Sequence, residues 1–131
     1  MIDHMTFGIT DFARSTAFYD QALAPLGIFR LVVVPTEHTN GVQVAGYGEE
    51  RPWLWLAEER ATTGLLHIAL QAETHTAVDA FHAAALKAGG RNNGAPGPRP
   101  HYHANYYGAF ILDPDGHNIE AVCHKAFDKL A

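Results

Sequence analysis

Nine histidines occur among the 131 residues, although imidazole is costly to bury and adds little to an apolar core. His4 and His67 each begin a strand-like segment, and Glu120 lies in the apolar segment 119–122. Two neutral imidazoles and one carboxylate can bind a divalent cation and leave coordination positions open for a substrate. A bound cation would also remove the desolvation cost of a buried carboxylate. We therefore interpret His4, His67 and Glu120 as ligands of one metal ion.

The two histidines occupy equivalent positions of an internal repeat. Residues 4–27 align with residues 67–90 at a constant offset of 67 − 4 = 63. The identical pairs are His4/His67, Ala17/Ala80, Phe18/Phe81, Ala22/Ala85, Leu23/Leu86 and Gly27/Gly90. Because equivalent positions of two packed copies are related by the symmetry of the packing, the two imidazoles can converge on one point.

Each copy is predicted to begin with a strand followed by a helix. Strands are expected at 4–9 and 65–72, where the residues alternate in polarity and many are β-branched or aromatic. Asp11 and Thr74 have side chains that cap helix N-termini. Gly27 and the pair Gly89-Gly90 can adopt the left-handed conformation that ends a helix.

The rest of each copy completes the predicted fold. The β-rich segments 29–34, 42–46 and 53–57 give the first copy the order βαβββ. In the second copy we interpret the proline- and glycine-rich segment 92–100 as a loop, followed by strands at 106–112 and 118–122 around the turn sequence Asp113-Pro114-Asp115-Gly116. The sequence thus predicts one α+β domain, 1–131, in which two tandem βαβββ modules (about 1–60 and about 61–131) form a curled mixed sheet.

Composition excludes several classes of partner. Nine basic and fourteen acidic residues give a net charge of −5, which would repel a phosphate backbone, so no nucleic acid is expected. Apolar runs fall far short of the roughly 20 residues that span a bilayer, and no signal-peptide pattern begins the chain, so we expect a cytoplasmic protein without a membrane partner. The single cysteine, Cys123, cannot form an intrachain disulfide.

These residues together resemble the vicinal oxygen chelate superfamily, which includes glyoxalase I, bleomycin-resistance proteins, extradiol dioxygenases and fosfomycin-resistance thiol transferases. The resemblance rests on Ile2-Asp3-His4, Phe18-Tyr19, His67-Ile68-Ala69-Leu70 and the closing segment 110–120, FILDPDGHNIE. It implies a glyoxalase-like fold with His4, His67 and Glu120 as metal ligands. It also implies a homodimer, and leaves open whether each site forms within one chain or across two.

This sequence departs from the glyoxalase I pattern at one ligand position, and the difference bears on the reaction. Glyoxalase I usually supplies a fourth ligand from the last strand of the first unit, but the segment 53–57 is apolar here, and Ala57 lies 120 − 57 = 63 residues before Glu120. A three-ligand site is more similar to the dioxygenase and thiol-transferase branches. Thr6 resembles a threonine that lies near the metal-bound oxygen in fosfomycin-resistance enzymes.

Polar and aromatic residues in the segment 101–107 are typical of a pocket wall. His103 or Tyr106 is our candidate general acid or base, because histidine titrates near neutrality and tyrosine donates a hydrogen bond. The sequence does not choose between them. Trp55, Tyr107 and Phe110 are candidate substrate contacts.

The leading hypothesis is a metal-dependent enzyme, a lyase or isomerase or a dioxygenase, with thiol transfer less favoured. It would chelate a small oxygen-rich substrate through two vicinal oxygens on one divalent ion, Fe, Mn, Zn, Ni or Mg. The alternative is a metal-free protein of the bleomycin-resistance type that binds a small molecule or drug. The presence of all three ligand residues favours the enzyme.

Overall fold

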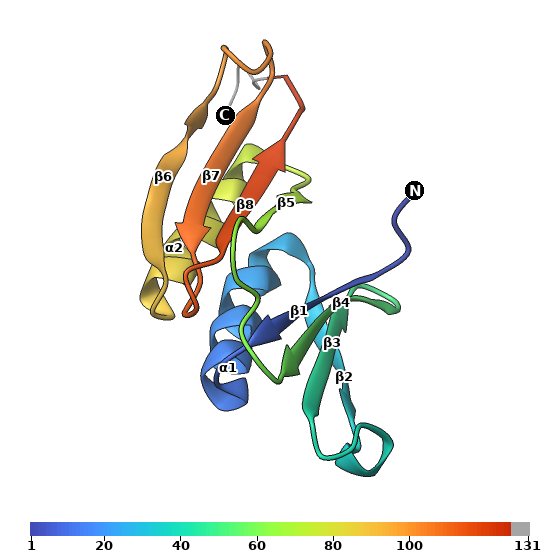
Figure 1. The fold of residues 1–131 in the computed structure, drawn as a ribbon. Coiled ribbons are helices and arrows are strands. Elements are labelled where there is room, and N and C mark those ends of the chain that lie inside the picture. The colour runs from blue at the N-terminus through green and yellow to red at the C-terminus, as the bar shows by residue number, and fades with distance from the viewer. Residues whose placement is uncertain (127–131) are drawn as a thin grey trace.

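The computed structural model describes residues 1–126, which form two modules of one helix and four strands each (Figure 1). The first module comprises β1 (Met5–Ile9), α1 (Phe12–Leu23), β2 (Phe29–Val34), β3 (Gln43–Gly48) and β4 (Pro52–Glu58). The second comprises β5 (His67–Gln71), α2 (His75–Lys87), β6 (Arg91–Pro98), β7 (Tyr107–Leu112) and β8 (Asn118–Cys123). Two short 3-10 helices, η1 (Ala24–Leu26) and η2 (Thr36–His38), follow α1 and β2. The predicted α+β class and the two βαβββ modules are therefore confirmed, whereas residues 127–131 of the second predicted module lie outside the described residues.

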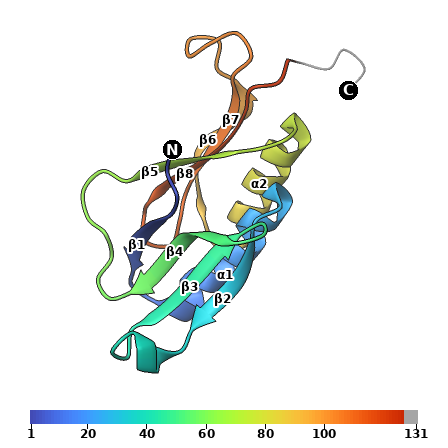
Figure 2. The ribbon, with the colours of Figure 1, turned by 90° about the vertical axis from the view of Figure 1, so that its right-hand side faces the viewer.

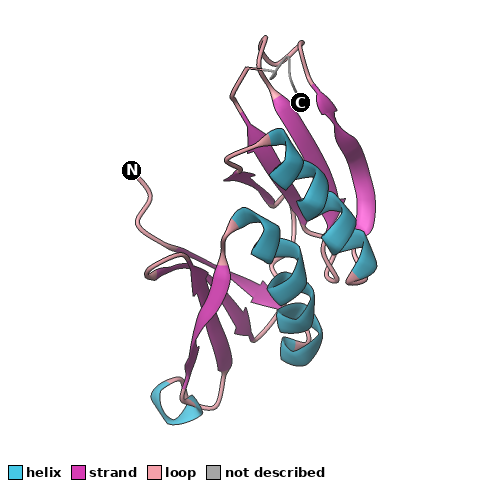
Figure 3. Ribbon diagram, turned by 180° about the vertical axis from the view of Figure 1, so that it is seen from behind, coloured by secondary structure: helices cyan, strands magenta, loops and turns pink. Residues whose placement is uncertain are grey.

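The two sheets have the same topology, with strand orders β1-β4-β3-β2 and β5-β8-β7-β6. In each sheet the first strand of the module runs parallel to the last, and the other neighbours are antiparallel. The sheets are both mixed, as expected, but they remain separate and do not join into one curled sheet within the chain. Each helix covers one face of its own sheet, and the two helices pack side by side (Figures 2 and 3). The opposite face of each sheet therefore carries no helix.

Both helices begin at the residues that their sequences indicate, whereas α1 ends at Leu23 and the predicted cap Gly27 ends the following helix η1 instead. The side chain of Asp11 accepts a hydrogen bond from the backbone N–H of Arg14 (3.0 Å), and that of Thr74 does the same for Ala77 (3.0 Å). Gly27 has a φ of 75° after η1, a left-handed conformation that costs a glycine little. No helix within residues 1–126 is long and apolar enough to cross a membrane.

The apolar core lies between each helix and its sheet. Side chains alternate along a strand, so every second residue points toward the helix. The largest fully buried apolar and aromatic side chains are Ile9, Phe18, Tyr19, Leu23, Tyr47, Leu54, Leu56, Val78, Phe81, Ile111 and Ile119. Burial of this face leaves the other face of each sheet available for polar residues.

The segment interpreted as a loop at 92–100 is a strand over most of its length, so that prediction was wrong. β6 pairs with β7, but its register shifts between Asn92 and Gly94 and again between Gly94 and Gly97. β6 is the outer strand of its sheet, so one of its sides has no neighbouring strand. Proline lacks a backbone N–H, but on that side it gives up no hydrogen bond between strands. Pro96 and Pro98 are therefore tolerated in this strand.

The turn between β7 and β8 is tied to the first module through Asp113. Its Oδ1 accepts hydrogen bonds from the backbone N–H groups of Asp115 (2.9 Å) and His117 (2.8 Å), which stabilises the predicted turn. Its Oδ2 accepts a hydrogen bond from the hydroxyl of Tyr19 in α1 (2.5 Å). Since Asp113 is only 2% exposed, these donors replace the water that its carboxylate loses.

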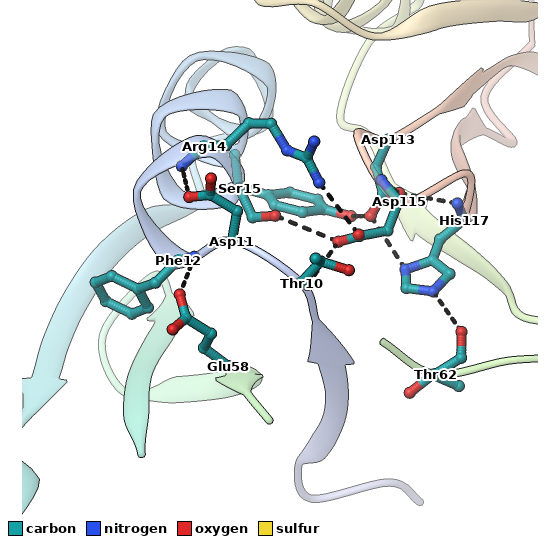
Figure 4. A network of polar contacts seen from close by, with 11 residues as sticks. Thr10, Asp11, Phe12, Arg14, Ser15, Glu58, Thr62, Asp113, Asp115 and His117 are labelled. Atoms are coloured by element: carbon teal, nitrogen blue, oxygen red, sulfur yellow. Dashed lines mark hydrogen bonds and ion pairs between the residues drawn. The ribbon is translucent and has the colours of Figure 1, made fainter. Parts of the chain in front are cut away.

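His117 and Asp115 extend this joint to other segments of the first module (Figure 4). The Nδ1 of His117 lies 3.2 Å from the same buried carboxylate, and its Nε2 lies 2.9 Å from the carbonyl oxygen of Thr62, in the link between the modules. Asp115 accepts a hydrogen bond from the backbone N–H of Thr10 (3.2 Å) and pairs with Arg14 (3.3 Å). Polar contacts thus join the modules in addition to the packing of α1 against α2.

Candidate metal and substrate site

His67, Glu120 and Phe110 lie on the open face of the second sheet. Phe110 pairs with Glu120 across β7 and β8, and Ala69, two residues after His67, pairs with Glu120 across β5 and β8. Because side chains alternate, these three share the face opposite α2. The intervening residues, such as Ile119, are buried toward the helix.

The predicted ligands His67 and Glu120 contact each other. The Nε2 of His67 lies 2.9 Å from the Oε1 of Glu120. Glu120 is 1% exposed, whereas 42% of the His67 side chain is exposed, so the pair connects a buried carboxylate to solvent. Neighbouring ligand atoms bound at about 2.1 Å to one octahedral ion are about 3 Å apart, so these two atoms fit a shared divalent cation.

Tyr106 holds the second oxygen of Glu120. Its hydroxyl donates a hydrogen bond to Oε2. Burial, followed by this hydrogen bond and the charge of Glu120, raises the pKa of Tyr106, so the hydroxyl keeps its proton at neutral pH. A Cβ at Gly108 would lie 3.1 Å from both the Tyr106 ring and Oε2 of Glu120, which shows how closely the three residues pack.

His103, the other candidate acid or base, does not contact Glu120. Its Nε2 lies 2.7 Å from the Nδ1 of His124, and the two rings stack with centroids 4.7 Å apart. Both rings make T-shaped contacts with the ring of Tyr106, at 5.3 Å and 5.4 Å between centroids. Of the two candidates, Tyr106 therefore lies at the ligands. Because 21 residues separate His103 from His124, no local sequence pattern indicates this pair.

His4, Thr6 and Trp55 lie together on the open face of the first sheet. Thr6 pairs with Trp55 across β1 and β4. The indole lies over Gly46, where a Cβ would come within 2.7 Å of the ring. With Val44 and Pro52, these three residues line a shallow cavity of about 340 Å³.

Asp3 contacts the imidazole of His4. Its Nδ1 lies 2.6 Å from the Oδ1 of Asp3, whose other oxygen pairs with Arg51 at 2.7 Å. The hydrogen bond to His4, followed by the charge of Arg51, lowers the pKa of Asp3. Metal-binding histidines are commonly oriented by a carboxylate in this way, and Nε2 of His4 has no other partner within residues 1–126. Asp3 was assigned no role from the sequence, although its position next to His4 is the pattern that could have indicated this contact.

A single chain does not bring all the predicted ligands together. No group of three histidine, cysteine, aspartate or glutamate side chains that could hold a metal ion occurs among residues 1–126. His67 and Glu120 lie in β5 and β8, Tyr106 directly precedes β7, and His4 directly precedes β1 of the other sheet. A separate cavity of about 450 Å³ is lined by His67 and the rest of β5, the N-terminal residues Ile2 and Asp3, and Trp53.

Tyr107, a predicted substrate contact, points to the helix side of the second sheet. Its hydroxyl donates a hydrogen bond to Asp79 in α2 (2.6 Å), and its ring stacks on His75 with centroids 4.3 Å apart. Burial, followed by the hydrogen bond to Asp79, raises the pKa of Tyr107 to about 12. The chain therefore does not place Tyr107 beside Glu120, whereas the ring of Phe110 lies 5.9 Å from that of His67.

Comparisons with known proteins agree with the observed fold. A family model described as the Glyoxalase/Bleomycin resistance protein/Dioxygenase superfamily matches residues 1–121. No curated protein matches the sequence. A crystal structure of a glyoxalase/bleomycin resistance protein from Albidiferax ferrireducens is 28% identical, with a TM-score of 0.79 over 92% of this chain and 97% of that chain.

Two further solved structures share the fold at lower identity. A glyoxalase I mutant from Zea mays is 20% identical, with a TM-score of 0.71 over 96% of this chain and 45% of that chain. The fosfomycin resistance protein FosX from Listeria monocytogenes is 16% identical, with a TM-score of 0.69 over 95% of this chain and 93% of that chain. At these identities the comparison bears on the fold alone.

Proposed function

Since the chain belongs to the Glyoxalase/Bleomycin resistance protein/Dioxygenase superfamily, we propose that it is a metal-dependent enzyme acting on a small oxygen-rich substrate. The cation is held by His67 and Glu120 of one chain and by His4 of a second copy. The contact between His67 and Glu120 at 2.9 Å, on an uncovered sheet face, carries this proposal. When bound, the cation supplies Lewis-acid polarisation of two vicinal substrate oxygens.

The separation of the ligands within one chain supports a site between two copies. The His4 side chain is 60% exposed on a face without a helix, and His67 is 42% exposed on another such face. A twofold dimer that sets the first sheet of each chain against the second sheet of its partner covers both faces and completes two equivalent sites. The same arrangement brings Thr6 and Trp55 of one chain opposite Phe110 of the other.

The side chains around the ligands have distinct roles in this proposal. The hydroxyl of Tyr106 holds a proton beside Glu120 and is the group that can donate it to a substrate oxygen. His103 and His124 pack against the ring of Tyr106. Trp55 and Phe110 form apolar walls that exclude water from the bound substrate.

Metal content of matched variants tests the shared site. The purified protein, with divalent cation added and excess removed, is expected to hold one ion per chain. His4→Ala and Glu120→Ala proteins are each expected to hold none. When equal amounts of the two variants are refolded together, half of the dimers are heterodimers, and each heterodimer has one intact site. The mixture should therefore recover about one quarter of the metal-binding capacity of the wild-type protein. Glu59→Ala, which removes an exposed carboxylate of the first module, serves as the control.

Each result of this experiment has a distinct meaning. Loss of metal in both variants without recovery on mixing would place all ligands in one chain and overturn the shared site. An unmodified protein that binds none of Fe(II), Mn(II), Zn(II), Ni(II) or Mg(II) would overturn the enzyme proposal. In that case binding of an aromatic drug by the metal-free protein would identify it as a binder of the bleomycin-resistance type.

The substrate class is tested by thermal shift with the metal-loaded dimer. The probes are α-hydroxyketones, catechols and hemithioacetals, each of which presents two neighbouring oxygens. A ligand that binds the folded, metal-loaded protein raises the unfolding temperature by mass action, and the shift disappears in Glu120→Ala. Shifts that persist in that variant would separate ligand binding from the metal site.

A further inference from the structure

Arg99 places a cation on the face that carries His67 and Glu120. Its Cζ lies 5.6 Å from the centroid of the Phe110 ring, whose other neighbour is the ring of His67, 5.9 Å between centroids. Phe110 pairs directly with Glu120 in the sheet. The guanidinium, the aromatic ring and the two candidate ligands therefore form one continuous surface.

The backbone of β6 fixes the position of this guanidinium. One terminal nitrogen donates to the carbonyl oxygen of Gly97 (2.9 Å) and the other to that of Ala95 (2.8 Å). A Cβ built at Gly94 or Gly97 would lie at ordinary van der Waals distance (3.4 Å) from a guanidinium nitrogen, so the guanidinium lies directly against the β6 backbone. A cation that is held in advance loses little conformational entropy when it binds an anion.

The charge of Arg99 has no acidic partner among residues 1–126, unlike that of three other arginines. Arg14, Arg30 and Arg51 each pair with an aspartate at 2.7 to 3.3 Å. The carbonyl groups that Arg99 contacts are neutral and occupy only part of its five N–H donors. The remaining donors and the full positive charge are available to an anion.

We propose that Arg99 binds an anionic oxyacid group of the substrate, a carboxylate or a phosphonate, that lies beyond the two chelating oxygens. An aromatic or flat body of the substrate then rests on Phe110, between this anchor and the metal ligands. The proposal rests on the proposed function for the role of the ligands, but anion binding at Arg99 itself does not require a metal. It names the substrate class as oxygen-chelating compounds with a separate negative charge.

The metal-independent part is tested on the metal-free protein by NMR of the arginine side-chain Nε–Hε groups. Phenylacetate and phenylphosphonate are expected to shift the Arg99 signal, whereas benzyl alcohol is not. The Arg99 signal is identified by its loss in Arg99→Lys, and the Arg60 signal serves as an internal control. The relative effects of the two anions distinguish a carboxylate from a phosphonate site. No shift with either anion would overturn the proposal.

The metal-dependent part compares two catechols that differ in one carboxylate. Metal-loaded wild-type protein is expected to bind 3,4-dihydroxyphenylacetate at least about tenfold more tightly than 4-methylcatechol at low salt, which corresponds to one charge-assisted contact. Arg99→Gln should bring the ratio of the two affinities close to one, Arg99→Lys should keep part of the preference, and Arg60→Gln should keep it entirely.

The two proposals fail in different ways. Equal binding of both catechols by metal-loaded wild-type protein would overturn the anion site and leave the metal site standing. Absence of metal binding, with a normal shift of the Arg99 signal by anions, would overturn the proposed function and retain the anion site. Unfolding temperatures of the Arg99 variants show whether the β6 backbone has been disturbed, and Arg99→Lys then provides the comparison with the charge retained.

Discussion

Trp55 and Glu120 occupy the same place in the two sheets. Trp55 pairs with Thr6 of β1, and Glu120 pairs with Ala69 of β5. The first-strand residues are 69 − 6 = 63 positions apart, as in the repeat, whereas the last-strand residues are 120 − 55 = 65 positions apart. The position equivalent to Glu120 in the first module therefore holds a tryptophan, not Ala57 as the constant offset indicated.

Trp55→Glu is expected to add a fourth ligand to the proposed site. A second carboxylate adds negative charge and a donor oxygen, so zinc or nickel should bind about tenfold more tightly, or about 1.4 kcal/mol. Affinity is measured by competition with a chelator of known strength. Trp55→Gln removes the same indole without adding a charge, and equal affinities of the two variants would contradict the prediction.

Gly108→Ala is expected to loosen the contact between Tyr106 and Glu120. The added Cβ lies 3.1 Å from both groups, so one of them must move. Because a partner that orients a metal ligand commonly contributes 10- to 100-fold in affinity, metal binding should fall by roughly that factor. Tyr106→Phe, which deletes only the hydroxyl, should give a similar loss; wild-type affinity in both variants would show that this hydrogen bond does not orient Glu120.

Tyr19→Phe is expected to weaken the joint between the modules. The hydroxyl of Tyr19 donates to a carboxylate that is 2% exposed, and its removal leaves Asp113 short of one donor. The free energy of unfolding should fall by about 1–3 kcal/mol, measured by urea denaturation. Tyr102→Phe alters a tyrosine that is 55% exposed and should change the free energy of unfolding little. Equal effects of the two substitutions would argue against a stabilising role for the joint.

Stability is expected to fall in alkaline solution because of four tyrosines. Burial, as the largest cause, raises the pKa of Tyr19, Tyr47, Tyr106 and Tyr107 above the ordinary value of 10.0. The folded protein holds these protons more tightly than the unfolded chain does. The contribution of the four tyrosines to the free energy of unfolding is therefore fully present below pH 10 and is lost as the pH rises above it.

Unfolding temperatures between pH 8 and 12, with tyrosinate absorbance measured in parallel, test this expectation. Tyrosinate should form mainly as the protein unfolds, and Tyr19→Phe should reduce the loss of stability per pH unit. Ionisation of all five tyrosines near pH 10 in a protein that stays folded would refute the assignment.

Much of the fold follows from local patterns in the sequence. The caps at Asp11 and Thr74 and the turn at Asp113 act within a few residues, so composition and spacing predicted them. β6 was missed because its prolines and glycines are tolerated only where one side of the strand stays unpaired, and a single segment does not show its place in a sheet.

The candidate site was predicted only in part for a similar reason. The repeat indicated that His67 and Glu120 matter, and the structure brings them into contact. The separation of His4 from this pair depends on how two whole modules pack. The surroundings of Arg99 depend on β-bulges in a strand that the sequence did not reveal, so no local pattern marked it as a possible binding residue.

The irregular outer strands affect how the protein behaves at high concentration. β2 is an outer strand, and its side chains Phe29 and Val33 are each 52% exposed. The unpaired backbone N–H and C=O groups of an apolar outer strand can pair with another chain and lead to fibrils. The register shift between Arg30 and Val32, like the shifts and prolines in β6, prevents a foreign strand from adding along the whole edge. Removing these irregularities would therefore favour aggregation even if every residue near Glu120 were left intact.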